Sequence, residues 1–149
     1  MKEYVIFDID GTLSDSSHRI QHAHMKDWDT FQSLAIDDPV IVPIATLLRR
    51  LSRHADVILL TGRQEKYRHI TKKWLEDAEL AYCYEELIMR EDDDFSHDIN
   101  MKIKALEKRF GNQENVIANV WFVIDDRDSV VEGFRNYGLT VLQPVAGSY

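Results

Sequence analysis

Two aspartates that directly follow an apolar segment have the residue type and spacing for chemistry. Asp8 and Asp10 stand in the run Asp-Ile-Asp-Gly-Thr-Leu, immediately after residues 4–7. One carboxylate can attack phosphorus, and a second carboxyl group can protonate a leaving alcohol and later activate water. A turn at Gly11 is expected to bring Asp10 toward the substrate. The pair predicts phosphoryl-transfer chemistry at a strand end.

A second acidic pair, Asp125 and Asp126, follows the apolar residues 120–124. A buried carboxylate without a partner is costly, so this position requires a cation or a hydrogen-bond network. Together with Asp8 the pair offers hard oxygen ligands, which suit Mg²⁺. The alternative is that Asp126 or Asp128 caps a helix.

Two further segments carry groups that could hold a phosphate. Thr61, Gly62 and Arg63 follow residues 57–60, where a hydroxyl and backbone N–H groups could bind phosphoryl oxygens as a helix begins. Lys102, near the start of a predicted helix, could balance the charge of a nucleophile and a phosphate. Lys104 and Lys108 are the alternative candidates for this role, and both are expected to be solvated.

Short apolar runs alternate with segments of helical period along the chain. The strands are expected at residues 4–7, 57–60, 86–89, 120–124 and 140–142, and helices at 40–51, 67–78, 99–110 and 130–138. The first helix is expected to start directly after Asp38 and Pro39, with Asp38 as its cap and Pro39 in its first turn. This order predicts an α/β fold, a three-layer Rossmann-like domain around a mainly parallel five-stranded sheet. Ligands of such sheets bind at the carboxyl ends of the strands.

The remaining segments lack a clear period. Residues 14–38 are rich in histidine and aspartate and are expected to form a small flap over the site, while residues 91–98 form an acidic loop. Within the flap, His18, His22 and His24 are interpreted as solvated or flap-contacting groups rather than metal ligands. Trp28 and Phe31 are expected to pack within the flap, with stacking on a base as the alternative. One domain over residues 1–149 is the expected organisation.

The composition limits the classes of function. A net charge of −8 argues against a broadly basic surface that would hold a long duplex. Membrane-length apolar runs and a leader segment are absent from the sequence, so a cytoplasmic protein is expected. The single cysteine, Cys83, excludes an internal disulfide.

Taken together, the four motifs resemble those of haloacid dehalogenase superfamily phosphatases in their order, across residues 8–126. The resemblance implies that Asp8 is the nucleophile and is transiently phosphorylated, and that Asp10 is the acid–base group. It also implies catalytic roles for Thr61 and Lys102. Mg²⁺ would be held by Asp8, the Asp10 backbone carbonyl and one of the pair Asp125 and Asp126, with Asp126 favoured as the direct ligand.

A narrower resemblance is to the 3'-phosphatase domain of phage polynucleotide kinase-phosphatase and to related bacterial stand-alone modules. Arg19 lies nine residues after Asp10, Arg63 closes the second motif, Asp98 lies four residues before Lys102, and Arg127 follows the acidic pair. The resemblance implies that the substrate is bound by Arg19, Gly62, Arg63 and Asp98. A nucleoside 3'-phosphate or a short single-stranded 3' end needs less basic surface than a duplex.

Two different functions are also compatible with the sequence. A small-metabolite or broad-range phosphatase would leave Arg19 as a surface residue. A non-catalytic subunit of a nucleic-acid repair assembly would retain the fold as a docking platform, although the charged residues Asp8, Asp10, Lys102 and Asp126 argue against it. The sequence indicates no particular protein partner.

Overall fold

A parallel five-stranded sheet lies at the centre of the computed structural model, which describes residues 3–148. The strands lie in the order β3-β2-β1-β4-β5, and every neighbouring pair is parallel. Their bounds are β1 (Tyr4–Phe7), β2 (Asp56–Gln64), β3 (Glu86–Arg90), β4 (Val120–Ile124) and β5 (Val141–Leu142). The five predicted strands and the parallel sheet are therefore confirmed, apart from the end of β2.

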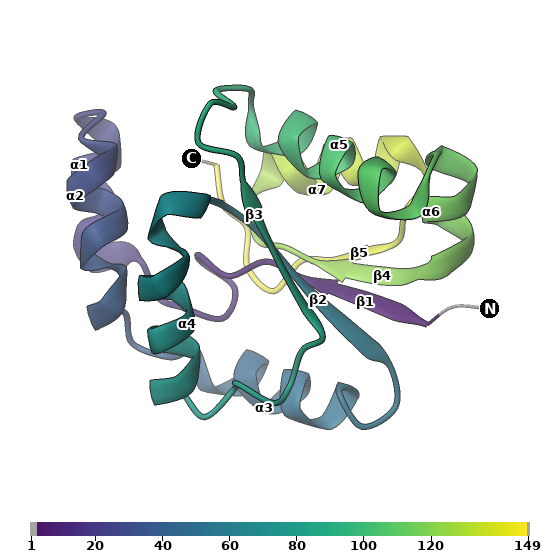
Figure 1. Ribbon diagram of the computed structural model, residues 1–149, viewed down its shortest axis with the longest axis horizontal. Coiled ribbons are helices and arrows are strands. Elements are labelled where there is room, and N and C mark those ends of the chain that lie inside the picture. Colours follow the sequence, from purple (N-terminus) through teal and green to yellow (C-terminus); the bar gives the residue numbers. More distant parts are fainter. Residues whose placement is uncertain (1–2, 149) are drawn as a thin grey trace.

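Helices cover both faces of the sheet (Figure 1). One face packs against α3 (Val42–Leu51) and α4 (Arg68–Asp77), and the other against α5 (Asp98–Phe110), α6 (Gln113–Asn119) and α7 (Asp128–Tyr137). The alternation of side chains along β1 explains the two cores, since Val5 and Phe7 belong to one apolar cluster and Ile6 to the other. The three-layer Rossmann-like architecture is confirmed.

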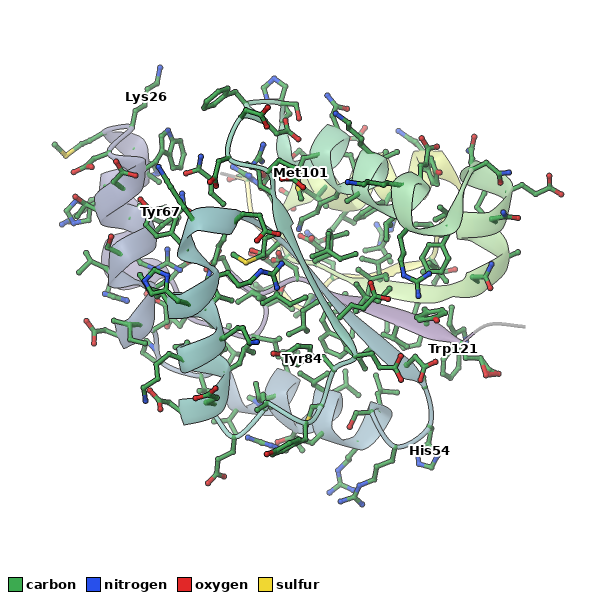
Figure 2. The ribbon with its side chains drawn as sticks, viewed as in Figure 1. Lys26, His54, Tyr67, Tyr84, Met101 and Trp121 are labelled. Carbon is green, nitrogen blue, oxygen red and sulfur yellow. The ribbon has the colours of Figure 1, made fainter. Side chains whose placement is uncertain are left out.

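The predicted flap, residues 14–38, is largely helical. It contains α1 (Ile20–His24) and α2 (Trp28–Ser33), with short 3₁₀ turns at Ser17–Arg19 and Leu34–Asp37. The two helices form a hairpin beside α4, and Lys26 at its tip points into solvent (Figures 1 and 2). Helices this short show no sequence period, which explains why the sequence predicted none here.

Two predicted boundaries are wrong. β2 continues past Leu60 to Gln64, so Thr61, Gly62 and Arg63 lie in the strand and no helix begins there; α4 begins at Arg68, after a 3₁₀ turn at Glu65–Tyr67. Similarly, α3 begins at Val42 with Pro43 in its first turn, so Asp38 and Pro39 do not start it. In both places polar or proline-containing residues obscured the boundary.

The helix α6 had no counterpart in the sequence prediction. Val116 is the buried residue of α6, and a single buried residue does not form the apolar stripe by which a helix is predicted. Among the helices of residues 3–148, none combines the length and apolar character that crossing a bilayer would need.

Candidate active site

The functional side chains gather where β1, β2 and β4 end. Asp8 follows β1, Asp125 and Asp126 follow β4, and Lys102 lies in the second turn of α5. Because the strands are parallel, their carboxyl ends meet at one edge of the sheet. These four residues line one cavity of about 620 Å³.

Lys102 lies between two of the carboxylates. Its Nζ donates to Asp8 Oδ1 at 2.9 Å and to Asp125 Oδ2 at 2.7 Å. On the other side, Thr12 Oγ1 lies 3.2 Å from both Asp8 Oδ2 and Asp126 Oδ1, and donates its one proton to either. All five side chains are buried, so their charges are poorly screened by water.

The balance of charge in this cluster favours a bound cation. Burial raises the pKa of Asp8, and the charge of Asp125 raises it further, although Lys102 opposes the shift. Burial lowers the pKa of Lys102, but Asp125 and Asp8 outweigh this and raise it. Carboxylate oxygens of Asp8, Asp125 and Asp126 lie within 4.8 Å of one another. This donor set of hard oxygens fits a divalent cation such as Mg²⁺.

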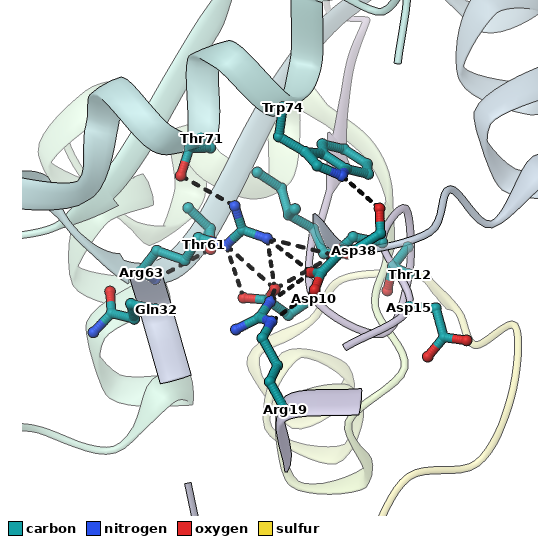
Figure 3. Close-up of polar contacts among 12 residues, drawn as sticks. Asp10, Thr12, Asp15, Arg19, Gln32, Asp38, Thr61, Arg63, Thr71 and Trp74 are labelled. Carbon is teal, nitrogen blue, oxygen red and sulfur yellow. Dashed lines mark hydrogen bonds and ion pairs between the residues drawn. The ribbon is translucent and has the colours of Figure 1, made fainter. Parts of the chain in front are cut away.

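The carboxylate of Asp10 contacts two buried arginines (Figure 3). Arg63 Nη2 donates to Asp10 Oδ1 at 2.7 Å, and Arg19 Nη2 contacts the same oxygen. Arg19 also donates to both oxygens of Asp38, at 2.8 and 2.7 Å, and His18 lies 2.7 Å from Asp38. Asp10 thus joins the flap to β2.

These arginines determine the charge of Asp10. Burial works against ionisation, but the charges and hydrogen bonds of Arg63 and Arg19 hold the pKa of Asp10 well below its usual range. Asp10 is therefore a carboxylate in this structure, which is the form that activates water. For Asp10 to donate a proton, another charge must counteract the arginines and raise the pKa of Asp10.

The comparisons with known proteins decide the family. Residues 2–149 match the family model described as the Polynucleotide kinase PNKP phosphatase domain. The chain belongs to this family. It is a phosphatase of the haloacid dehalogenase type.

Relatives of this PNKP phosphatase domain are larger. Over 99% of its length it is 30% identical to a chain in the structure of the Pnkp1/Rnl/Hen1 RNA repair complex, with a TM-score of 0.80, and spans 44% of that chain. It is 26% identical over 147 residues to the "Putative bifunctional polynucleotide kinase/RNA ligase" of Autographa californica nuclear polyhedrosis virus, covering 97% of this chain and 20% of the viral protein. The chain thus spans less than half the length of these relatives.

A more distant neighbour shows the fold alone. The haloacid dehalogenase-like hydrolase SP0104 of Streptococcus pneumoniae is 14% identical, with a TM-score of 0.69 over 95% of this chain and 84% of the neighbour.

In this PNKP phosphatase domain, the predicted site residues fall into two groups. Eight of them line the cavity, namely Asp8, Asp10, Gly62, Arg63, Asp98, Lys102, Asp125 and Asp126. The other two, Thr61 and Arg19, are fully buried. The alternative of a small-metabolite phosphatase predicted that Arg19 lies at the surface. That prediction is wrong, because Arg19 is fully buried.

The geometry also settles the roles of several residues near the motifs. Arg127 occupies the N-cap position of α7, so neither Asp126 nor Asp128 is the N-cap residue. Lys104 and Lys108 are exposed. His18 contacts Asp38 within the flap, as expected of a flap-contacting histidine.

Asp98 belongs to a second ion-pair network at the rim of the cavity. Its carboxylate pairs with Arg90 and Arg127, while its charge also raises the pKa of Lys102. Gly62 lies against it so closely that an added Cβ would stand 2.8 Å from Asp98 Oδ1. Gly62 O accepts from Arg90 Nε at 3.0 Å, so this network ties β2, β3 and α5 together.

Sequence reasoning assigned no role to Thr12, Asp38, Arg90 or Arg127 in the site. Thr12 and Arg127 lie within the motifs, so their position beside catalytic candidates could have identified them as site residues. Arg90 ends β3 at the same sheet edge as the other site residues, which was a weaker signal. Asp38 ends the aperiodic segment 14–38, and its predicted role was that of a helix cap.

Replacing Arg19 with methionine is expected to lower the free energy of unfolding by about 3–5 kcal/mol, because Asp38 and Asp10 lose a buried partner. Chemical denaturation of both proteins gives this difference. Arg50→Met, at an exposed arginine, is the matched control and should change stability by less than about 0.5 kcal/mol. A loss below about 1 kcal/mol for Arg19→Met would mean that the pairing contributes little.

Proposed function

We propose that this domain is a Mg²⁺-dependent phosphomonoesterase that acts through an aspartyl-phosphate at Asp8, and that its substrate is a 3'-phosphate of a nucleic-acid end or nucleotide. The observation that carries the proposal is the buried cluster in which Lys102 contacts Asp8 and Asp125. A docking platform without activity has no use for such a cluster, since buried charges cost stability.

The metal would be held by Asp8, the Asp10 backbone carbonyl and Asp126, with Asp125 acting through water. Asp125 is the less suitable direct ligand because its Oδ2 accepts from Lys102 and its Oδ1 accepts from the Arg127 N–H. When bound, the cation neutralises developing charge on the phosphoryl oxygens and orients the substrate.

In the first step, an Asp8 oxygen forms a bond to phosphorus while the bond from phosphorus to the alcohol oxygen breaks. Asp10 gives its proton to the leaving oxygen. The arginines disfavour the protonated form of Asp10, but a phosphate dianion beside it raises its proton affinity and opposes them. Lys102 balances the charge of Asp8 and the phosphoryl group, and Thr61 and Arg63 bind or position the phosphoryl oxygens.

In the second step, Asp10 accepts a proton from water as the water oxygen attacks phosphorus. The bond between phosphorus and Asp8 breaks, which regenerates the carboxylate and releases inorganic phosphate. The lowered pKa of Asp10 favours this step, because the carboxylate is the form that accepts a proton.

The 3'-phosphate specificity is supported by the family and by the likeness to a chain of an RNA repair complex. Only about 620 Å³ of cavity lies over Asp8, which suits a single nucleotide or a strand end rather than a duplex.

A substrate panel tests this assignment. We expect kcat/KM for a 3'-phosphorylated oligonucleotide or a nucleoside 3'-phosphate to exceed that for a nucleoside 5'-phosphate or a sugar phosphate by at least about 10-fold, since each 1.4 kcal/mol of differential binding gives tenfold. Chelation by EDTA should abolish turnover and Mg²⁺ should restore it. Equal turnover of all four substrates would instead indicate a broad-range phosphatase.

A further inference from the structure

Two exposed aromatic side chains line the cavity from opposite segments. Trp28, in α2, is 51% exposed, and Phe95, in the loop of residues 91–97 between β3 and α5, is 87% exposed. Both line the cavity that contains Asp8. Figure 1 shows the α1–α2 hairpin and this loop as separate segments beyond the sheet. The expectation that Trp28 packs within the flap is therefore confirmed only in part, since it contacts Phe31 but half of its side chain is exposed.

The loop that carries Phe95 is held in a fixed shape. Arg90 Nη1 donates to the backbone carbonyls of Asp94 and Ser96, at 3.2 and 2.7 Å, which are the residues on either side of Phe95. The Asp94 carboxylate also accepts from the Ser96 N–H at 2.9 Å. Phe95 is thus presented to solvent by a braced loop.

The part of the cavity wall that α2 forms is also anchored. Trp28 packs edge-to-face on Phe31, with ring centroids 5.9 Å apart. The Arg19 guanidinium lies 4.2 Å above the Phe31 ring and donates to the Phe31 carbonyl at 2.9 Å. Gln32 accepts from the Gln64 N–H at 2.8 Å, which fixes α2 to β2. Trp28 and Phe31 both line the cavity, and Phe31 is also held within the flap by Arg19.

The cavity lining has a buried charged part and, on the flap, an apolar part. Ile20 and Ala23 continue the apolar surface beside Trp28, whereas Asp8 and Lys102 belong to the charged part. A ligand that matches both parts carries a phosphate at one end and a flat, weakly polar ring near it. Nucleotides have this combination.

We propose that Trp28 and Phe95 form a base-binding subsite that stacks on the nucleobase of the nucleotide whose 3'-phosphate is attacked by Asp8. This inference rests on the proposed function. Every base has a stacking face, so the subsite tolerates any sequence. The exposed acidic residues Asp92 and Asp93 belong to the same loop as Phe95 and repel upstream phosphates. Recognition is therefore concentrated on the terminal nucleotide.

Kinetics with three substrates test the subsite: a nucleoside 3'-phosphate, a tetranucleotide with a 3'-phosphate, and glycerol phosphate, which has no ring. In Trp28→Ala and Phe95→Ala, the kcat/KM ratio of either nucleotide substrate to glycerol phosphate should fall about 10- to 100-fold. The loss should appear in KM. Trp28→Phe, which keeps a stacking face, should retain most of the ratio.

Two remote aromatic residues serve as matched controls. Trp121 and Tyr82 are 55% and 100% exposed, and neither lines this cavity in the described part of the chain. Trp121→Ala and Tyr82→Ala should leave the ratio at the wild-type value.

A binding measurement does not depend on the alanine variants folding. In Asp8→Asn, a nucleoside 3'-phosphate should quench the fluorescence of Trp28, inorganic phosphate should not, and the quench should be lost in Asp8→Asn/Trp28→Phe. An unchanged ratio, equal losses on all three substrates, a response limited to the tetranucleotide, or no quench would overturn the subsite. Failure of the wild type to hydrolyse any of the three esters would instead overturn the proposed function.

Discussion

Replacing Asp8 with asparagine is expected to lower kcat for every phosphomonoester by about 10⁴-fold or more, since an amide cannot serve as the nucleophile. No neighbouring carboxylate can take over. Asp10 is held by two arginines, and Asp125 is held by Lys102. The fold should persist, because asparagine has nearly the same shape and the substitution removes one of several repelling charges.

Steady-state turnover with Mg²⁺ and a nucleoside 3'-phosphate measures this loss. Asp37→Asn, at an exposed aspartate, is the matched control and should retain wild-type activity. Mass spectrometry of acid-quenched wild-type enzyme should detect a phosphoryl group on Asp8, and the variant should show none. Mg²⁺-dependent turnover in Asp8→Asn at the wild-type rate would identify another nucleophile.

The second large effect is expected at Lys102. Lys102→Met leaves Asp8 and Asp125 without the ammonium group that contacts both. We expect kcat to fall about 10²- to 10³-fold, by analogy with the loss of one preorganised donor. Without metal, the free energy of unfolding should fall by about 3–5 kcal/mol, as when one partner of a buried ion pair is removed. Added Mg²⁺ should stabilise the variant more than the wild type.

Turnover and denaturation curves with and without Mg²⁺ check these expectations. Lys104→Met is the control on the same helix, because Lys104 is exposed. It should change activity less than about twofold and stability by less than about 0.5 kcal/mol. If Lys104→Met were as damaging as Lys102→Met, the charge of α5 as a whole would matter rather than the contact with Asp8.

Much of the fold could be predicted because its strands are apolar runs that end in polar residues. β1 and β4 were placed at their observed bounds for this reason, and the residues after them, Asp8 and Asp125, were correctly placed at one edge of the sheet. Lys102 could be selected over Lys104 only through the resemblance, since both lie on the same predicted helix. In the structure Lys102 is buried and contacts Asp8 and Asp125.

The remainder was hidden for physical reasons. Two helices of the flap are under two turns long, so no period could reveal them. The end of β2 consists of Thr61 to Gln64, which lack the apolar side chains that mark a strand, and three of these positions are part of the site. Arg90 and Asp38 resemble ordinary surface charges in sequence, and only the folded chain shows that each serves several partners.

The place of β1 in the sheet has a consequence for synthesis of the chain on the ribosome. β1 lies between β2 and β4, and β4 follows it only after four-fifths of the described residues have been made. One edge of this apolar strand thus stays unpaired during most of translation, a state prone to aggregation. Asp125 and Asp126 arrive with β4. Phosphatase activity should therefore appear only in chains that include β4, which makes it a sensitive reporter of folding in truncated or stalled products.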